Sequence, residues 1–245
     1  MQIRNALSNI ADIFLPDYCP ICGDSLTLNR CGSLPQLQIC NKCFNLAEAS
    51  EFSIEYAELK RCVKCGYPLT SESETCSRCR QTQWSFDSSI SIFLYSGHAK
   101  KIISSYKFKN LKTLALYFSN KIYQKYLIQF NDCTIVPTPF RPSAKNNRGW
   151  DQIELITDIL NTRYSLPVLN CLKRKNGPAQ KTMSFNARTE NLKNKISLKK
   201  NIKMPDKILL VDDVFTTGAT MEKCARTLKD AGALKVFCIT LAIDL

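Results

Sequence analysis

Apolar positions repeat with two different periods along residues 89–245, and each period indicates one kind of element. Short apolar runs typical of buried strands occupy residues 89–95, 133–136, 207–211 and 236–243. Helical spacing of apolar residues fills the intervals 99–127 (one long helix or two shorter ones), 149–161 and 218–231. Strands that alternate with helices predict a parallel sheet flanked by helices, which is an α/β layer fold.

Residues 1–88 show little periodicity, and we expect them to form a small cysteine-rich module that precedes the α/β domain of residues 89–245. Four apolar residues near the start have helical spacing: Ile3, Leu7, Ile10 and Phe14. Polar Asn9 and Asp12 interrupt this stretch, so a secretory signal is not expected. Apolar runs are only a few residues long, which predicts no membrane span and a cytoplasmic protein.

Cysteine usage sets the first module apart. Nine of the 13 cysteines lie in the first 79 residues, and eight of them form four Cys-x-x-Cys pairs: Cys19/Cys22, Cys40/Cys43, Cys62/Cys65 and Cys76/Cys79. Two thiolates separated by two residues can bind one metal ion from a tight turn, and two such turns complete a tetrahedral zinc site. We therefore predict two structural zinc ions, with an iron–sulfur cluster or redox-active dithiols as alternatives.

The order of the pairs leaves two arrangements open. Sequential pairing would join the first pair to the second and the third to the fourth, giving two zinc ribbons; cross-braced pairing would join the first to the third. Loops of 17 and 10 residues within the sequential sites favour the ribbons. Cys31 has no nearby partner and is not expected to be a ligand. The remaining single cysteines are expected in the core: Cys133, Cys171, Cys224 and Cys238.

The formal charge of +13 is high for 245 residues. Residues 98–125 hold seven lysines and no acid, and residues 171–203 hold ten Lys or Arg against Glu190 alone. Such clustering favours a phosphate-bearing partner, whereas a lysine-rich proteome would explain only the total charge.

The sequence VDDVFTTGAT at residues 211–220 follows an expected strand and opens an expected helix. It lacks the glycine spacing of dinucleotide-binding and Walker loops. Backbone amides at the helix start and three threonine hydroxyls can bind a phosphate, and Gly218 lets the backbone approach it. Asp212 and Asp213, expected just past the strand, can accept hydrogen bonds from two ribose hydroxyls.

This segment resembles the signature of type I phosphoribosyltransferases, and the other motifs narrow the resemblance to the ComF family of competence-associated proteins. After the cysteine pairs come Tyr-x-Gly and Lys-Phe (Tyr95, Gly97, Lys107, Phe108), a Pro-x-Pro loop with Arg and Arg-Gly (Pro137, Pro139, Arg141, Arg148, Gly149), Gln152, and Arg174, Gln180, Arg188 and Asn191. The resemblance spans nearly the whole chain. It implies a type I phosphoribosyltransferase-like sheet preceded by a double zinc ribbon.

The resemblance also implies a site for phosphoribosyl pyrophosphate (PRPP) with Mg²⁺. The ribose and 5-phosphate would contact Asp212, Asp213, Thr216, Thr217, Gly218, Ala219 and Thr220. The pyrophosphate would meet the loop at residues 136–148 and a mobile flap at 173–191, with candidate contacts at Thr138, Arg141, Arg148, Arg174, Gln180 and Arg188. A basic flap can close over the pyrophosphate charge and exclude water.

The sequence assigns no catalytic residue. Hypoxanthine-type phosphoribosyltransferases carry an Asp, suited to act as a general base, two residues before the loop glycine, where this chain has Thr216. Adenine- and orotate-type enzymes also lack that Asp, so catalysis stays open. The only histidine, His98, is expected as a helix-cap or surface residue. No glutamine-hydrolysing domain is present, so amidotransferase activity is not expected.

Three functions remain open. The resemblance favours a PRPP-binding protein that supports DNA uptake or processing during natural transformation, with the DNA-uptake machinery as partner. The second is an active phosphoribosyltransferase, a glycosyltransferase with an unknown acceptor. The third is a zinc-ribbon protein that binds single-stranded nucleic acid and keeps a vestigial ligand loop. Aromatic residues for base stacking would be Tyr106, Phe108, Tyr117, Tyr123 and Tyr126, although their helical spacing favours a place in the core.

Overall fold

The computed structural model describes residues 18–26, 37, 39–52, 58–70, 74–140, 149–174 and 196–244. Two features discussed above, the helical spacing at residues 3–14 and the unpaired Cys31, lie outside these residues. Within the described part of the chain, no helix is both long and apolar enough to cross a bilayer.

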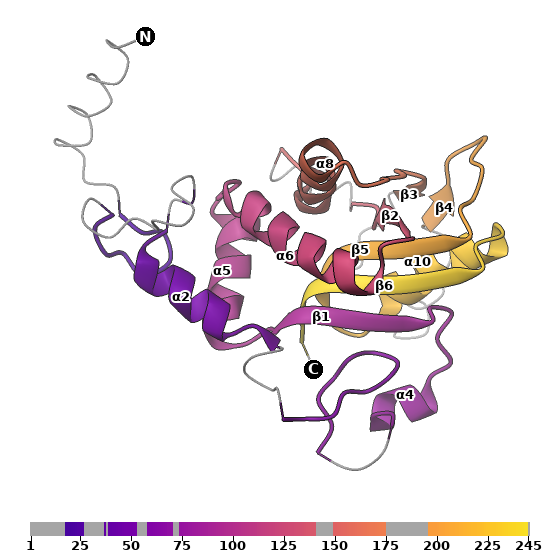
Figure 1. The fold of residues 1–245 in the computed structure, drawn as a ribbon, viewed down its shortest axis with the longest axis horizontal. Coiled ribbons are helices and arrows are strands. Elements are labelled where there is room, and N and C mark those ends of the chain that lie inside the picture. Colours follow the sequence, from indigo (N-terminus) through magenta and orange to yellow (C-terminus); the bar gives the residue numbers. More distant parts are fainter. Residues whose placement is uncertain are drawn as a thin grey trace, which may run out of the picture.

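A four-stranded parallel sheet lies at the centre of the molecule (Figure 1). Its strands, in the spatial order β1-β6-β5-β2, are β1 (Ser88–Leu94), β6 (Lys235–Ile243), β5 (Lys207–Phe215) and β2 (Thr134–Pro137). Every neighbouring pair is parallel, and Leu210 of β5 lies between Val136 of β2 and Cys238 of β6. The predicted α/β fold with a parallel sheet is therefore confirmed.

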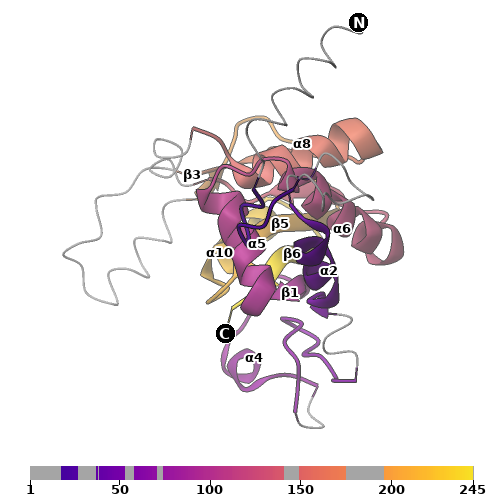
Figure 2. The same ribbon diagram turned by 90° about the vertical axis from the view of Figure 1, so that its left-hand side faces the viewer.

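Helices cover both faces of the sheet (Figures 1 and 2). One face carries α5 (Gly97–Phe108), α6 (Leu114–Gln129) and α8 (Gln152–Tyr164), and the other carries α10 (Ala219–Asp230). The interval 99–127 thus contains two helices. Helix α8 begins later than expected because the Asp151 side chain caps it, accepting hydrogen bonds from the amides of Ile153 at 2.9 Å and Glu154 at 3.2 Å.

Alternate side chains of β5 enter two separate apolar clusters. Leu209 and Val211 pack with α5, α6 and α8, whereas Ile208 and Leu210 pack with α10. Successive side chains of a strand point to opposite faces, and both faces of this strand are covered. Because both faces are buried, the first half of β5 is an uninterrupted apolar run rather than an alternation of apolar and polar residues.

The antiparallel pair β3 (Leu172–Arg174) and β4 (Ile196–Leu198) was not expected from the sequence. Each strand has three residues, which is too short for a periodic pattern to indicate it. The expected flap at 173–191 starts at the end of β3, and apart from Lys173 and Arg174 it lies outside the described residues.

The cysteine-rich residues pack against both faces of the α/β part. Helix α2 (Asn41–Ala49) contacts α5, and Cys43 belongs to the apolar cluster on that face. The segment that contains α4 (Ser77–Gln81) approaches the opposite face, where Cys65 belongs to the cluster around α10. Residues on the two sides of position 88 share apolar clusters, so the packing does not mark a boundary there. A domain boundary near residue 88 stays a prediction.

Candidate functional site: the phosphate loop and two cysteine tetrads

The loop at residues 211–220 starts inside the sheet. Strand β5 extends to Phe215, four residues beyond its expected end, so Asp212 and Asp213 lie within the strand rather than just past it. Pairing with β6 explains the difference, since Phe215 still lies opposite Ile243 at the end of that strand. Both carboxylates are therefore held on a paired backbone at the carboxyl edge of the sheet, where open α/β sheets bind ligands.

Asp213 forms an ion pair with Lys107 of α5. The ammonium of Lys107 lies 2.8 Å from Oδ2 of Asp213, and both side chains are largely buried, with exposures of 12% and 24%. Lys107 belongs to the Lys-Phe motif noted above, but no role followed from its sequence, because its partner lies more than a hundred residues away in the chain.

The pKa of Asp212 is raised to about 7. Burial is the main cause, and the adjacent negative charge of Asp213 adds to it. Hydrogen bonds from the Asp213 amide, at 2.9 Å, and from the Thr138 side chain act in the opposite direction, as does the charge of Lys107. A carboxylate at this edge of the sheet is suited to accept hydroxyl hydrogen bonds or to face a cation.

The turn after β5 depends on Gly218, whose φ of 76° lies in the left-handed region that favours glycine. A Cβ atom there would lie 2.7 Å from both the Phe215 and the Trp84 rings. Helix α10 begins at the next residue, so its first amides face the turn. Thr216, Thr217 and Ala219 are exposed beside them, and Thr220 is half-buried. The predicted 5-phosphate contacts thus lie in one turn, directly after the strand that carries Asp212 and Asp213.

The pyrophosphate side of the expected site is described in part. Thr138 follows β2, is buried, and donates its amide to the carbonyl oxygen of Val211 at 3.0 Å. Thr138, Lys173 and Arg174 line one pocket of about 120 Å³, together with the carboxylates of Asp151 and Glu154. The remaining candidate contacts lie outside the described residues: Arg141, Arg148, Gln180 and Arg188.

The motif residue Gln152 has a structural role. Its backbone oxygen accepts a 2.6 Å hydrogen bond from the buried Tyr106 hydroxyl, and its side chain donates to the carbonyl oxygen of Lys107 at 3.5 Å. These contacts tie the start of α8 to the end of α5. They fix the turn of α5 from which Lys107 reaches Asp213.

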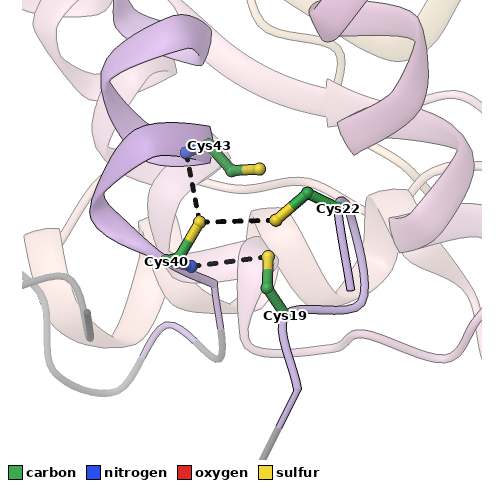
Figure 3. Close-up of side chains that lie close together, drawn as sticks. All are labelled: Cys19, Cys22, Cys40 and Cys43. Atoms are coloured by element: carbon green, nitrogen blue, oxygen red, sulfur yellow. Dashed lines mark hydrogen bonds between the residues drawn. The ribbon is translucent and has the colours of Figure 1, made fainter. Parts of the chain in front are cut away.

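The first cysteine tetrad consists of Cys19, Cys22, Cys40 and Cys43, whose sulfur atoms all lie within 4.8 Å of one another. Figure 3 shows the four side chains converging from two segments. The Cys40 amide donates to the sulfur of Cys19 at 3.5 Å, and the Cys43 amide donates to that of Cys40 at 3.4 Å. Sequential pairing of the first two cysteine pairs is therefore confirmed.

The second tetrad consists of Cys62, Cys65, Cys76 and Cys79, again with all sulfur atoms within 4.8 Å. The Cys76 amide donates to the sulfur of Cys62 at 3.4 Å. Both tetrads thus follow the sequential arrangement, and the cross-braced alternative is wrong. Each set offers four sulfur ligands to one metal ion.

The thiols of each tetrad differ in pKa because their surroundings differ. Burial raises the pKa of Cys19 and Cys62, but backbone N–H donors outweigh it and lower both values, that of Cys62 to about 7. Burial and the neighbouring thiols raise the pKa of Cys43 and Cys65. A divalent cation among the four sulfur atoms would favour the thiolate form of all of them, so these residues fit a bound metal.

Most lysines of the basic stretch at 98–125 have partners within the protein. Three ammonium groups pair with carboxylates: Lys107 with Asp213, Lys121 with Glu48 and Glu51, and Lys125 with Glu51. Lys109 donates to the carbonyl oxygen of Pro20, and Lys100 and Lys112 lie over the Tyr95 and Trp150 rings. The cluster of positive charge in the sequence therefore does not form a row of lysines that all face solvent.

The expected core residues are found in the core. Three of the proposed stacking aromatics, Tyr106, Tyr117 and Tyr126, are buried, whereas Phe108 is 67% exposed. The single cysteines at 133, 171, 224 and 238 are buried as well. His98, the second residue of α5, is half-buried, and burial and the charges of Lys101 and Lys42 lower its pKa.

The chain is similar in sequence to a phosphoribosyl transferase domain and to competence proteins. A family model described as a phosphoribosyl transferase domain matches residues 172–244, which include the loop at 211–220. The chain is 27% identical over 226 residues to competence protein ComFC of Streptococcus pneumoniae, covering 89% of this chain and 96% of that protein. It is 29% identical over 189 residues to competence protein F of Haemophilus influenzae, covering 71% and 81%.

Two further similarities complete the comparison. The DNA utilization protein YhgH of Escherichia coli K12 is 25% identical over 241 residues, with 92% of this chain and 97% of that protein covered. A solved structure titled "Analysis of an invariant aspartic acid in HPRTs-asparagine mutant" has 11% identity and a TM-score of 0.31, and covers 53% of this chain and 63% of its own. The structural similarity adds no weight, but the sequence matches confirm the resemblance to the ComF family that the ordered motifs indicated.

Proposed function

We propose that this protein binds PRPP together with Mg²⁺ at the carboxyl edge of the sheet. The observation that carries the proposal is the succession of two carboxylates, a left-handed glycine and a helix start between Asp212 and Thr220. Asp212 and Asp213 would accept hydrogen bonds from the ribose hydroxyls. The amides after Gly218 and the threonine hydroxyls would bind the 5-phosphate.

The pyrophosphate would lie toward Thr138, Lys173 and Arg174, which share one pocket. Mg²⁺ binds phosphate oxygens and would neutralise part of the pyrophosphate charge. Arg141, Arg148, Gln180 and Arg188 remain proposed contacts from the resemblance.

Calorimetric titration of the full chain with PRPP tests this function. We expect saturable binding of one PRPP per chain that requires Mg²⁺. Ribose 5-phosphate should bind more weakly, because it lacks the pyrophosphate that the metal and the basic residues would contact. A folded, metal-loaded protein that releases no heat with PRPP and Mg²⁺ would overturn the proposal.

Ligand binding is supported more directly than turnover. Thr216 occupies the position where a general base would be expected; it is exposed, and its carbonyl oxygen accepts a hydrogen bond from Arg78. The match to a phosphoribosyl transferase domain nevertheless favours phosphoribosyl transfer as a second candidate function. Pyrophosphate release with a panel of acceptor bases distinguishes it from binding alone.

The relatives named as competence and DNA utilization proteins support a role for this chain in DNA uptake or processing during natural transformation. We propose that it acts in the cytoplasm, where thiols such as those of the two tetrads stay reduced and available to metal ions. The DNA-uptake machinery is the proposed partner. Direct contact with single-stranded DNA is favoured less, since three of the lysines of residues 98–125 pair with carboxylates of the protein.

We further propose that each tetrad holds one zinc ion in a structural role. Four sulfur ligands fill a tetrahedral zinc site and leave no position for a substrate. Elemental analysis of protein purified without chelator should give two zinc ions per chain. One zinc per chain, or iron in its place, would contradict this assignment.

A further inference from the structure

The second cysteine tetrad contacts the phosphate loop through Arg78, which lies between two of its ligands, and Trp84, which lies just after them. Arg78, between Cys76 and Cys79, donates from Nη1 to the carbonyl oxygen of Thr216 at 2.7 Å. Trp84 donates its indole N–H to the sulfur of Cys79 at 3.2 Å. One contact thus reaches the loop from the tetrad, and the other fixes a tryptophan on the tetrad.

The Trp84 ring fills the space beside the loop glycine. A Cβ atom at Gly218 would lie 2.7 Å from Cη2 of Trp84, so the indole and the turn are in close contact. The ring also stacks on Phe86 at 5.0 Å and meets Phe215, the last residue of β5, edge-on at 6.1 Å. A single side chain therefore contacts a tetrad sulfur and the turn that would bind phosphate.

Ser85, which follows Trp84, holds the start of α10, directly after the loop. Glu222, in the first turn of α10, accepts hydrogen bonds from the Ser85 amide at 2.6 Å and the Ser85 hydroxyl at 2.8 Å. The loop is thus held at Thr216, at Gly218 and at the start of α10 by residues 78–85. The first tetrad, in contrast, packs with the cluster on the other face of the sheet.

We propose that the second tetrad and its metal set the conformation of the phosphate loop, with Arg78 as the positioning residue. This inference rests on the proposed binding of PRPP. Metal bound by Cys76 and Cys79 fixes the turn that carries Arg78. Without the metal or the guanidinium, the loop becomes ordered only when the ligand binds. The free energy needed to order the loop then reduces the affinity for the ligand.

Matched arginine variants test the inference. Arg78→Ala should weaken PRPP binding about tenfold, because it removes one charge-assisted hydrogen bond that orders the loop. Arg80→Ala is the control: Arg80 lies in the same helix and carries the same charge, but it donates to the carbonyl oxygen of Thr75 instead. It should change the affinity less than twofold. Arg78→Lys, which keeps a donor, should recover part of the loss, and all three variants should retain two metal ions.

Tryptophan fluorescence separates positioning from a general loss of structure. In a Trp150→Phe background, Trp84 is the only tryptophan in the chain. Its emission should change when PRPP binds to the metal-loaded protein, and that response should diminish in Arg78→Ala although the fold is intact. If wild type binds PRPP while Arg78→Ala binds as well as Arg80→Ala, only this inference is overturned. If metal-loaded wild type binds no PRPP, the proposed function fails and this inference fails with it.

Discussion

Asp212→Asn is expected to weaken PRPP binding about 10- to 100-fold and, at the same time, to make the protein more stable above pH 7. The loss of affinity corresponds to one hydrogen bond to a charged group, about 1.5–3 kcal/mol. The gain in stability follows from the pKa of Asp212, which is raised to about 7 in the folded protein, mainly by burial and by the charge of Asp213.

The sign of the stability effect follows from proton linkage. A carboxyl group whose pKa is higher in the folded than in the unfolded state binds more protons when folded, so stability falls as the pH rises from about 4 to about 7. Asparagine carries no charge and avoids this loss. We therefore expect equal stability of variant and wild type near pH 4 and an advantage for the variant on the order of 4 kcal/mol at pH 8, since the pKa rises from 3.8 to about 7.

The measurements are calorimetric titration for binding and chemical unfolding at both pH values for stability. Asp206→Asn is the matched control: Asp206 is exposed just before β5, at the opposite end of the strand from the loop. It should leave PRPP affinity unchanged. Unaltered affinity of Asp212→Asn would remove Asp212 from the ligand site, and a loss of stability at pH 8 would show that the buried charge is compensated.

The sequence was informative wherever local pattern decides structure. The apolar run of β5 and the four cysteine pairs have fixed short-range spacings, so the parallel sheet, the helices that cover it and both tetrads could be predicted, whereas α2 and α4 were not. The upstream part of the loop could be predicted only in outline. Whether β5 ends at Val211 or at Phe215 depends on pairing with β6, which is a partner supplied by the fold.

Contacts between distant parts of the chain account for what the sequence did not predict. Lys107 and Lys121 have the same appearance in a basic stretch, yet one holds Asp213 of the loop and the other is buried against α2. Likewise, nothing in the spacing of Cys76 and Cys79 indicates that the residue between them, Arg78, reaches Thr216. These partners are chosen by how the cysteine-rich residues pack on the sheet, and a single sequence does not encode that packing in a local pattern.

Replacing Lys121 with Met is expected to destabilise the protein by about 3 kcal/mol, lowering the melting temperature by about 6–12 °C. The Lys121 ammonium lies 2.8 Å from a carboxylate oxygen of Glu48 and 2.9 Å from one of Glu51, and the Lys121 and Glu51 side chains are each only 9% exposed. The variant removes one of the two ammonium groups that lie 2.9 Å from carboxylate oxygens of the buried Glu51 and leaves that of Lys125. It also removes the ion pair between Lys121 of α6 and Glu48 of α2, which forms without a metal ion.

Two further variants identify the cause of that loss. Lys207→Met is the control, since Lys207 and its partner Asp132 are exposed by 49% and 56%, and an exposed pair contributes about 0–1 kcal/mol. Lys121→Met combined with Glu51→Gln should be more stable than Lys121→Met alone, because it also removes the buried carboxylate charge that has lost one of its ammonium partners. Thermal unfolding at constant metal content measures all three. If Lys121→Met melts no earlier than Lys207→Met, burial of Lys121 between Glu48 and Glu51 contributes no more to stability than a surface ion pair does.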